Sequence, residues 1–228
     1  GPALHIGIEL CTNEIIMKVD SDDILKPDRF SKQINFMNTH SDCVLCGSNL
    51  TMFKTQDNKM LNMGDTNHKE ILLWEEYKLT KSHWFTSHPT LCYKKSAILD
   101  VGNYNKEKKF DWYACDDFEL QLKILKKFGK IYNIQESLIY YRLHGEQITA
   151  NGNSSQRPEI VNFRNNYIKQ MIKDDINLID INNNNNNNIN INLKNNNNNT
   201  NNNNINLVNN NNNNNNYFID NHGNIIKH

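Results

Sequence analysis

The sequence predicts an α/β domain over residues 1–175 and an asparagine-rich tail over residues 176–228. Along the first segment, short apolar runs typical of strands alternate with stretches whose apolar residues recur at helical spacing. Such alternation favours an α/β domain. Beyond Asn182 the chain is mostly asparagine with isolated Ile, Leu and Val, which offer little apolar surface to offset the entropy of ordering. We therefore expect a disordered tail.

The first part of the domain is predicted to hold a helix, a strand and a second helix. Residues 3–12 form the first helix, and Glu14–Val19 form a strand that runs into an acidic turn. Pro27 suits the first turn of the next helix, in which Phe30 and Ile34 recur at roughly helical spacing. Farther along, we expect strands at Cys43–Cys46, Leu50–Phe53 and Leu91–Tyr93, a polar loop at Gln56–Thr66, and helices at His68–Tyr77 and from about Ser96.

The clearest helix covers Asp117–Phe128. Phe118, Leu122 and Leu125 share one apolar stripe, and Gly129 ends the helix. After it we expect two short strands and a further helix, at Ile131–Ile134, Leu138–Leu143 and residues 158–172 respectively.

Charge and hydropathy exclude two classes of partner. Lys plus Arg equal Asp plus Glu, so the chain lacks the basic excess of a nucleic-acid-binding protein. No apolar run approaches the roughly 18–20 residues that span a bilayer, and no signal peptide opens the chain, which favours a cytoplasmic location. The five cysteines do not form a disulfide framework, and the Cys43–Cys46 pair is interpreted as two buried side chains.

An acidic turn, Asp20-Ser21-Asp22-Asp23, follows the first predicted strand. In an extended segment, residues i and i+2 point to the same side, so Asp20 and Asp22 can aim at one point. Two convergent carboxylates at the carboxyl end of a strand suit Mg²⁺ or Mn²⁺. Such a cation would neutralise a diphosphate leaving group. The alternative is a solvated turn, with Asp23 contributing to the entry of the next helix.

A second acidic cluster opens the clearest helix. Asp116 and Glu119 fit a capping box with Asp116 as the N-cap residue, in which case Asp116 satisfies free backbone N–H groups. Asp117, inside the helix, is freer to face a pocket. Trp112 lies just ahead of this cluster, where it either stacks on a sugar or packs in the core.

Several segments, taken in order, resemble the family 2 glycosyltransferases over residues 1 to about 150. The matching segments are Gly1–Glu9, Glu14–Ile24, Pro27–Phe30 with Gln33, His88–Thr90, Tyr93–Ala97, Gly102–Tyr104, Cys115–Leu122 and Ser137–Thr149. The resemblance implies an incomplete glycosyltransferase-A type (Rossmann-like) domain with a mixed sheet. The family's first strands, which hold an aspartate for the nucleotide base, have no counterpart here. We therefore expect unpaired sheet edges and an exposed apolar face.

The resemblance also implies roles for individual residues. Asp22 is expected to bind the Mn²⁺ or Mg²⁺ ion, and Asp20 to contact the metal or the donor's ribose. Asp117 is expected to be the general base in a direct displacement that inverts the anomeric carbon. Arg142 is a candidate for bidentate pairing with phosphate, and His144 for a further metal ligand. As an isolated residue, a histidine such as His144 is more often a hydrogen-bonded surface group.

These features predict a glycosyltransferase that moves a sugar from a nucleotide-diphosphate donor to a carbohydrate, lipid or protein acceptor. Asp116 and Trp112 are candidate acceptor contacts. Two alternatives stay open: a non-catalytic remnant of the same fold, and an interaction or assembly protein driven by the asparagine tract, because asparagine-rich chains can stack as β ladders.

Overall fold

The computed structural model describes residues 1–81, 85–107, 115–145, 157–175, 217–219 and 225–227. The chain forms two compact units, Gly1–Met171 and Ile172–His228. In the second unit, β8 (Tyr217–Ile219) and β9 (Ile225–Lys227) pair antiparallel. The sequence analysis expected no strands there. Most of the predicted tail lies outside the described residues.

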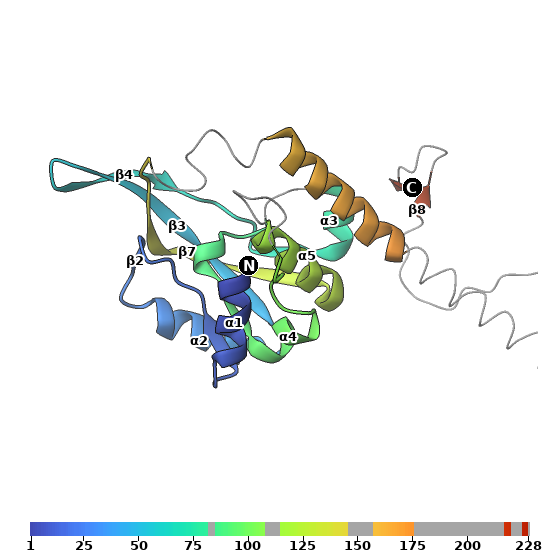
Figure 1. Ribbon diagram of the computed structural model, residues 1–228, viewed down its shortest axis with the longest axis horizontal. Helices are drawn as coiled ribbons and strands as arrows, with labels where there is room; N and C mark the ends of the chain where they lie inside the picture. Colours follow the sequence, from blue (N-terminus) through green and yellow to red (C-terminus); the bar gives the residue numbers. More distant parts are fainter. Residues whose placement is uncertain (82–84, 108–114, 146–156, 176–216, 220–224, 228) are drawn as a thin grey trace, which may run out of the picture. The chain divides into compact units, whose positions relative to one another are not determined.

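A mixed sheet forms the centre of the first unit (Figure 1). Across the sheet the strands are ordered β1 (Ile15–Met17), β6 (Cys92–Lys94), β3 (Leu45–Gln56), β7 (Lys130–Arg142) and β2 (Ile24–Leu25). β4 (Lys59–Asp65) pairs with β3, and β5 (Ile71–Leu73) pairs with β7. β3 and β7 run parallel, whereas the other pairs of this sheet are antiparallel. The predicted α/β class with a mixed sheet is therefore confirmed.

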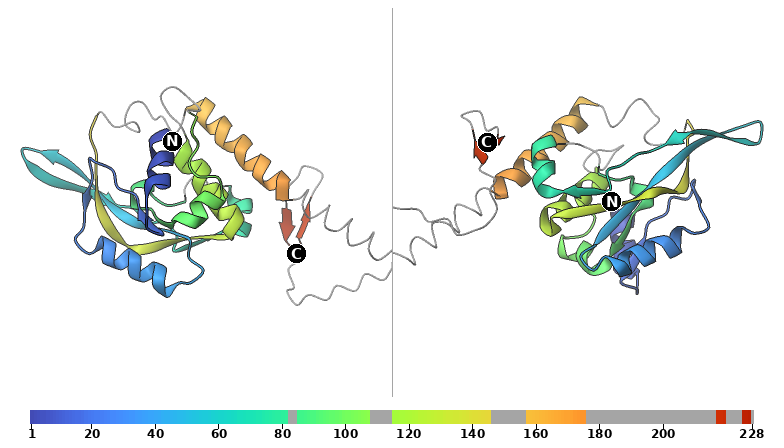
Figure 2. Two further views of the ribbon diagram at one scale, coloured as in Figure 1. Left: turned by 60° about the horizontal axis from the view of Figure 1, so that its bottom comes forward. Right: turned by 180° about the vertical axis from the view of Figure 1, so that it is seen from behind.

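Helices pack on both faces of the sheet, with α2 on one face and α5 on the other (Figure 2). The helices are α1 (Pro2–Leu10), α2 (Arg29–Thr39), α3 (Trp74–Thr80), α4 (Lys95–Asp100) and α5 (Asp116–Phe128), and residues 158–175 are also helical. α5 has the predicted apolar stripe, and Gly129 ends it in the left-handed conformation that glycine adopts without strain (φ 80°). The predicted helix at residues 158–172 is confirmed as well.

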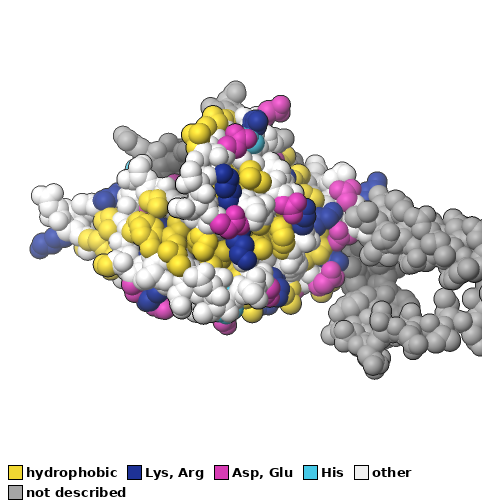
Figure 3. Space-filling view, turned by 90° about the horizontal axis from the view of Figure 1, so that it is seen from below, with side chains coloured by type: hydrophobic (Ala, Val, Ile, Leu, Met, Phe, Trp, Pro, Cys, Tyr) yellow, Lys and Arg dark blue, Asp and Glu magenta, His cyan; other side chains and the backbone are white. Residues whose placement is uncertain are grey.

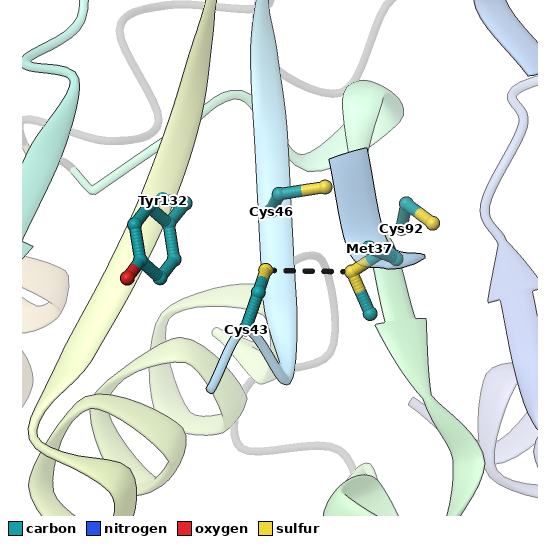
Figure 4. Close-up of a cluster of buried hydrophobic side chains, with 5 residues drawn as sticks. All are labelled: Met37, Cys43, Cys46, Cys92 and Tyr132. Atoms are coloured by element: carbon teal, nitrogen blue, oxygen red, sulfur yellow. Dashed lines mark hydrogen bonds between the residues drawn. The ribbon is translucent and has the colours of Figure 1, made fainter. Parts of the chain in front are cut away.

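The Cys43–Cys46 pair belongs to the core beneath α2 (Figure 4). Cys43, Cys46 and Cys92 are fully buried, and the Cys43 thiol lies 3.4 Å from the Met37 sulfur. Hydrogen bonds to the other two thiols, together with burial, raise the pKa of Cys46. These cysteines pack as small apolar side chains, as predicted.

Several predictions of local structure were wrong. The strands expected at Cys43–Cys46 and Leu50–Phe53 form one continuous strand, β3. The expected polar loop at Gln56–Thr66 is instead the turn and second strand of a long β3–β4 hairpin, which projects beyond the rest of the sheet (Figure 1). The two strands expected at Ile131–Ile134 and Leu138–Leu143 are one continuous strand, β7. In addition, the helix expected at His68–Tyr77 is divided into β5 and α3.

The sheet ends in short edge strands, and the surface carries exposed apolar side chains. Among the described residues, β1 pairs with β6 alone and β2 with β7 alone. Large apolar side chains are exposed on α1 (Ile6, Leu10) and on α2 (Phe30, Ile34), and Figure 3 shows a band of such side chains across one face. The expected sheet edges and apolar exposure are present, although β1 is only three residues long. None of the described helices has the length and apolarity needed to cross a membrane.

Gly47 of β3 marks a close approach between the sheet and the segment that carries the site. A Cβ atom at this position would lie 1.9 Å from the Thr86 hydroxyl oxygen, which itself donates to Asn133 at 2.6 Å. We expect Gly47→Ala to lower the free energy of unfolding by about 1–3 kcal/mol, because the extra methyl group overpacks the core. Gly7→Ala is the matched control, since its Cβ would meet nothing within 4 Å and helix propensity favours alanine. Urea unfolding showing equal losses for both variants would contradict this assignment.

Candidate functional site

The acidic turn lies in the segment between β1 and β2, the strands at the two opposite ends of the sheet order. The backbone folds back at this point, with the Asp23 N–H donating to the Asp20 carbonyl at 3.3 Å. The alternation rule for extended chains therefore does not apply. The Asp20 carboxylate pairs with the Lys18 ammonium group, whereas Asp22 contacts His144. The sequence analysis expected Asp20 and Asp22 to point at one position. In the structure the two carboxylates instead have different partners.

Asp22 and His144 lie side by side although 122 positions separate them in the sequence, with His144 Nε2 3.1 Å from Asp22 Oδ2. The pairing of β2 with β7 brings them together, because Ile24 lies opposite Tyr140 in the register. The hydrogen bond from His144 lowers the pKa of Asp22. Both side chains are partly exposed, at 40% for Asp22 and 36% for His144, so an ion or a substrate can reach them. The two predicted metal ligands are therefore neighbours.

Arg142 holds the acidic turn in place from β7. Its Nε donates to the Asp22 carbonyl at 2.9 Å, its Nη1 donates to the Thr55 hydroxyl at 2.9 Å, and its guanidinium stacks over Phe53. Its backbone N–H also donates to Asp23 Oδ1 at 3.0 Å. Burial raises the pKa of Asp23 to about 6. Arg142 thus fixes the shape of the turn, while its predicted contact with phosphate stays a prediction.

The two acids at the start of α5 face different surroundings. Cys115 is the N-cap residue, so the predicted capping box with Asp116 as N-cap is wrong. Asp116 is instead the first helical residue, and its carboxylate pairs with the nitrogen of Gly1. Asp117 Oδ1 accepts the Phe118 N–H at 2.7 Å. The helix begins at Asp116, one residue earlier than predicted. Cys115, which adopts a left-handed conformation (φ 53°), is its N-cap residue.

Asp117 lines a small cavity between α5, the helix at residues 158–171 and the segment that precedes β6. The cavity has a volume of about 60 Å³, and its lining residues are Phe85, Thr86, Ser87, His88, Asp117, Phe118, Gln121 and Arg164. The lining combines two aromatic rings with hydroxyl, amide and imidazole groups. The lining therefore offers both apolar ring faces and hydrogen-bonding groups.

His88 connects this cavity to the acidic turn. It belongs to the short 3₁₀ helix η1 (His88–Thr90), and its Nε2 lies 3.1 Å from the Tyr104 hydroxyl group. Burial, assisted by the charge of Lys18, lowers the pKa of His88 to about 3, while Asp20 and Asp116 act in the opposite direction. Groups from both acidic clusters thus influence one imidazole. His88 itself lines the cavity that also contains Asp117.

Sequence reasoning missed several residues of this region. His88 and Lys18 stood within the matching segments but received no role, because neither residue type identifies a ligand by itself. Arg164 comes from a helix that the motifs did not reach. Trp112, the predicted acceptor contact, lies outside the described residues.

Comparison with known proteins finds a family match in the first part of the chain. Residues 1–100 match the sequence model of glycosyl transferase family 2. The matched part contains α1, the acidic turn with the candidate metal ligand Asp22, and η1, which contributes to one wall of the cavity. α5 and β7 follow it in the chain.

Several curated proteins that the chain resembles are named glycosyltransferases. The chain is 25% identical over 148 residues to the amylovoran biosynthesis glycosyltransferase AmsE of Erwinia amylovora, covering 65% of this chain and 52% of that protein. It is 27% identical over 173 residues to the UDP-Gal:alpha-D-GlcNAc-diphosphoundecaprenol beta-1,3-galactosyltransferase of Escherichia coli, covering 74% and 60%. It thus spans roughly half the length of these relatives. Among solved structures, S. aureus TarS (residues 1–349) is similar with a TM-score of 0.42 and 14% identity, over 60% of this chain and 38% of TarS.

Proposed function

We propose that this protein is a metal-dependent, inverting glycosyltransferase. The donor is a nucleoside-diphosphate sugar, and the acceptor is a hydroxyl group of a carbohydrate, lipid or protein. The observation that carries the proposal is the contact of the Asp22 carboxylate with the His144 imidazole, in a chain whose Asp117 lines a cavity. The match of residues 1–100 to the family model supports it.

The residues at the acidic turn fit a divalent cation. A carboxylate oxygen and an imidazole nitrogen are ligands that Mn²⁺ accepts, and these two already lie 3.1 Å apart. Within the described part of the chain, no three His, Cys, Asp or Glu side chains gather into a metal site. The protein would therefore supply two ligands, Asp22 and His144, and leave positions for phosphate oxygens and water. When bound, the cation would neutralise charge on the diphosphate leaving group.

Asp117 performs the proton transfer in this proposal. As the acceptor oxygen attacks the anomeric carbon, the Asp117 carboxylate takes the hydroxyl proton. A bond forms between the acceptor oxygen and that carbon, and the bond from the carbon to the phosphate oxygen breaks. The electron pair of the broken bond leaves with the nucleoside diphosphate. A single displacement with one base inverts the anomeric centre.

A donor screen tests the proposal. The purified protein is incubated with a panel of nucleotide sugars in Mn²⁺ or in EDTA, beginning with UDP-galactose because the name of the Escherichia coli relative specifies that donor. We expect at least one donor to release its nucleoside diphosphate in Mn²⁺ and not in EDTA. Failure to bind Mn²⁺, together with no release from any donor, would favour a non-catalytic remnant of the fold.

A further inference from the structure

Lys18 is a buried cation beside the acidic turn. It follows β1, its exposed fraction is 8%, and its ammonium group pairs with the Asp20 carboxylate. Its backbone is held on both sides: its N–H donates to the Leu91 carbonyl at 2.9 Å, and its carbonyl accepts from Arg29 at 2.7 Å. The position of the ammonium group is therefore well defined.

The surrounding polar network is also buried and fixes this arrangement. Arg29 and Gln33 of α2 are 1% and 0% exposed, and the Arg29 Nε donates to the Gln33 side chain at 2.9 Å. Gln33 in turn donates to the Thr90 carbonyl at 2.7 Å, in the same 3₁₀ helix as His88. Lys18 is thereby tied to both the acidic turn and the wall of the cavity.

Stability alone does not explain a lysine in this place. Removing an ammonium group from water is costly, and a single ion pair with a partly exposed partner returns little. The Asp20 side chain is 37% exposed and could be hydrated without Lys18. The charge of Lys18 nevertheless reaches several groups of the site, since it acts on Asp22, Asp23 and His88 as well as on Asp20.

We propose that Lys18 is a built-in counter-ion of the donor site, which holds Asp20 away from the divalent cation and presents a second positive charge to the donor's diphosphate. This inference rests on the proposed function. It explains why Asp20 and Asp22 have different partners: Asp20 already has a cation, and Asp22 with His144 is left for the metal. A diphosphate bound between the ammonium group and the metal would be neutralised from two sides.

The proposal predicts opposite effects on two ligands when the charge is removed. In Lys18→Met, Mn²⁺ should bind about threefold to tenfold more tightly, because a repelling cation is gone and Asp20 is released. In saturating Mn²⁺, UDP should bind at least about tenfold more weakly, because the diphosphate loses one of its two cations. A lysine with a merely structural role would weaken both ligands together and lower the melting temperature.

Mn²⁺ binding is measured by electron paramagnetic resonance of the free ion, and UDP binding by calorimetry. Lys18→Arg keeps the charge and should keep both affinities within about threefold. Lys32→Met, which removes the ion pairs of Lys32 with Asp28 and Glu136 at the surface, is the matched control and should change neither affinity. Wild-type protein that binds no Mn²⁺ would overturn the proposed function and this inference with it. If the wild type binds Mn²⁺ but Lys18→Met binds it no more tightly, the inference alone fails.

Discussion

Replacing Asp117 by asparagine is expected to lower kcat by about two to four orders of magnitude while the protein remains folded. This is the range that a positioned general base contributes. Asparagine cannot take the proton of the acceptor hydroxyl at neutral pH, but its side-chain oxygen can still accept the Phe118 N–H that Asp117 accepts at 2.7 Å. Mn²⁺ binding should be unchanged, because the proposed metal ligands are on other elements.

The neighbouring acid provides the control for this experiment. Asp116→Asn changes a carboxylate one position away that pairs with the Gly1 nitrogen and is absent from the cavity lining. Its kcat should stay within about tenfold of the wild type, well above that of Asp117→Asn. If Asp117→Asn retained full activity while Asp116→Asn lost it, the base would have to be reassigned to Asp116.

The second large effect is expected at the metal side of the site. Asp22→Asn should weaken Mn²⁺ binding by about 10- to 100-fold and reduce nucleoside diphosphate release in parallel, because a neutral amide is a poor ligand for a hard cation. His144→Gln should act in the same direction. In the double variant, the second substitution should lower the Mn²⁺ affinity by less than it does in the wild type, because both residues bind the same ion.

Mn²⁺ titration followed by electron paramagnetic resonance measures these affinities, and raised Mn²⁺ concentrations should partly restore activity. Asp57→Asn serves as the matched control, because Asp57 lies at the tip of the β3–β4 hairpin with a positive φ (50°) that asparagine tolerates. Full Mn²⁺ affinity in Asp22→Asn would place the ion elsewhere.

Helices and strands were predicted correctly where the apolar pattern agreed with the residues that start or end an element. α5 was predicted to within one residue because its stripe is continuous and Gly129 provides the left-handed end. β7 was divided into two strands because Gln135 and Glu136 are exposed in its middle and interrupt the apolar run. In that strand, tertiary pairing with β3 outweighs the local sequence.

The β3–β4 hairpin was missed for a different reason. Every residue of β4 is exposed, so the strand has no buried face that would produce an alternating pattern. The available signal was the turn: Asp57 and Asn58 both have positive φ, as the two-residue turns that favour hairpins require. The pair in this chain, Asp57-Asn58, is a weaker indicator of such turns than Asn-Gly or Asp-Gly.

The sequence indicated candidate site residues but not the contacts that they make in the structure. The motifs indicated Asp22, His144 and Asp117, and the structure puts the first two in contact and the third in a cavity. The pairing of Asp20 with Lys18 and the bracing of the turn by Arg142 could not be read from the sequence. Both depend on the fold of the turn and on the packing of β7 against it.

The most direct test is a crystal structure of the protein with Mn²⁺ and UDP, or with whichever nucleoside diphosphate the donor screen identifies. The account predicts an anomalous Mn²⁺ peak in contact with Asp22 and His144, and a terminal phosphate that faces the cavity containing Asp117. A Mn²⁺ ion bound away from Asp22, or a diphosphate directed away from that cavity, would contradict the account.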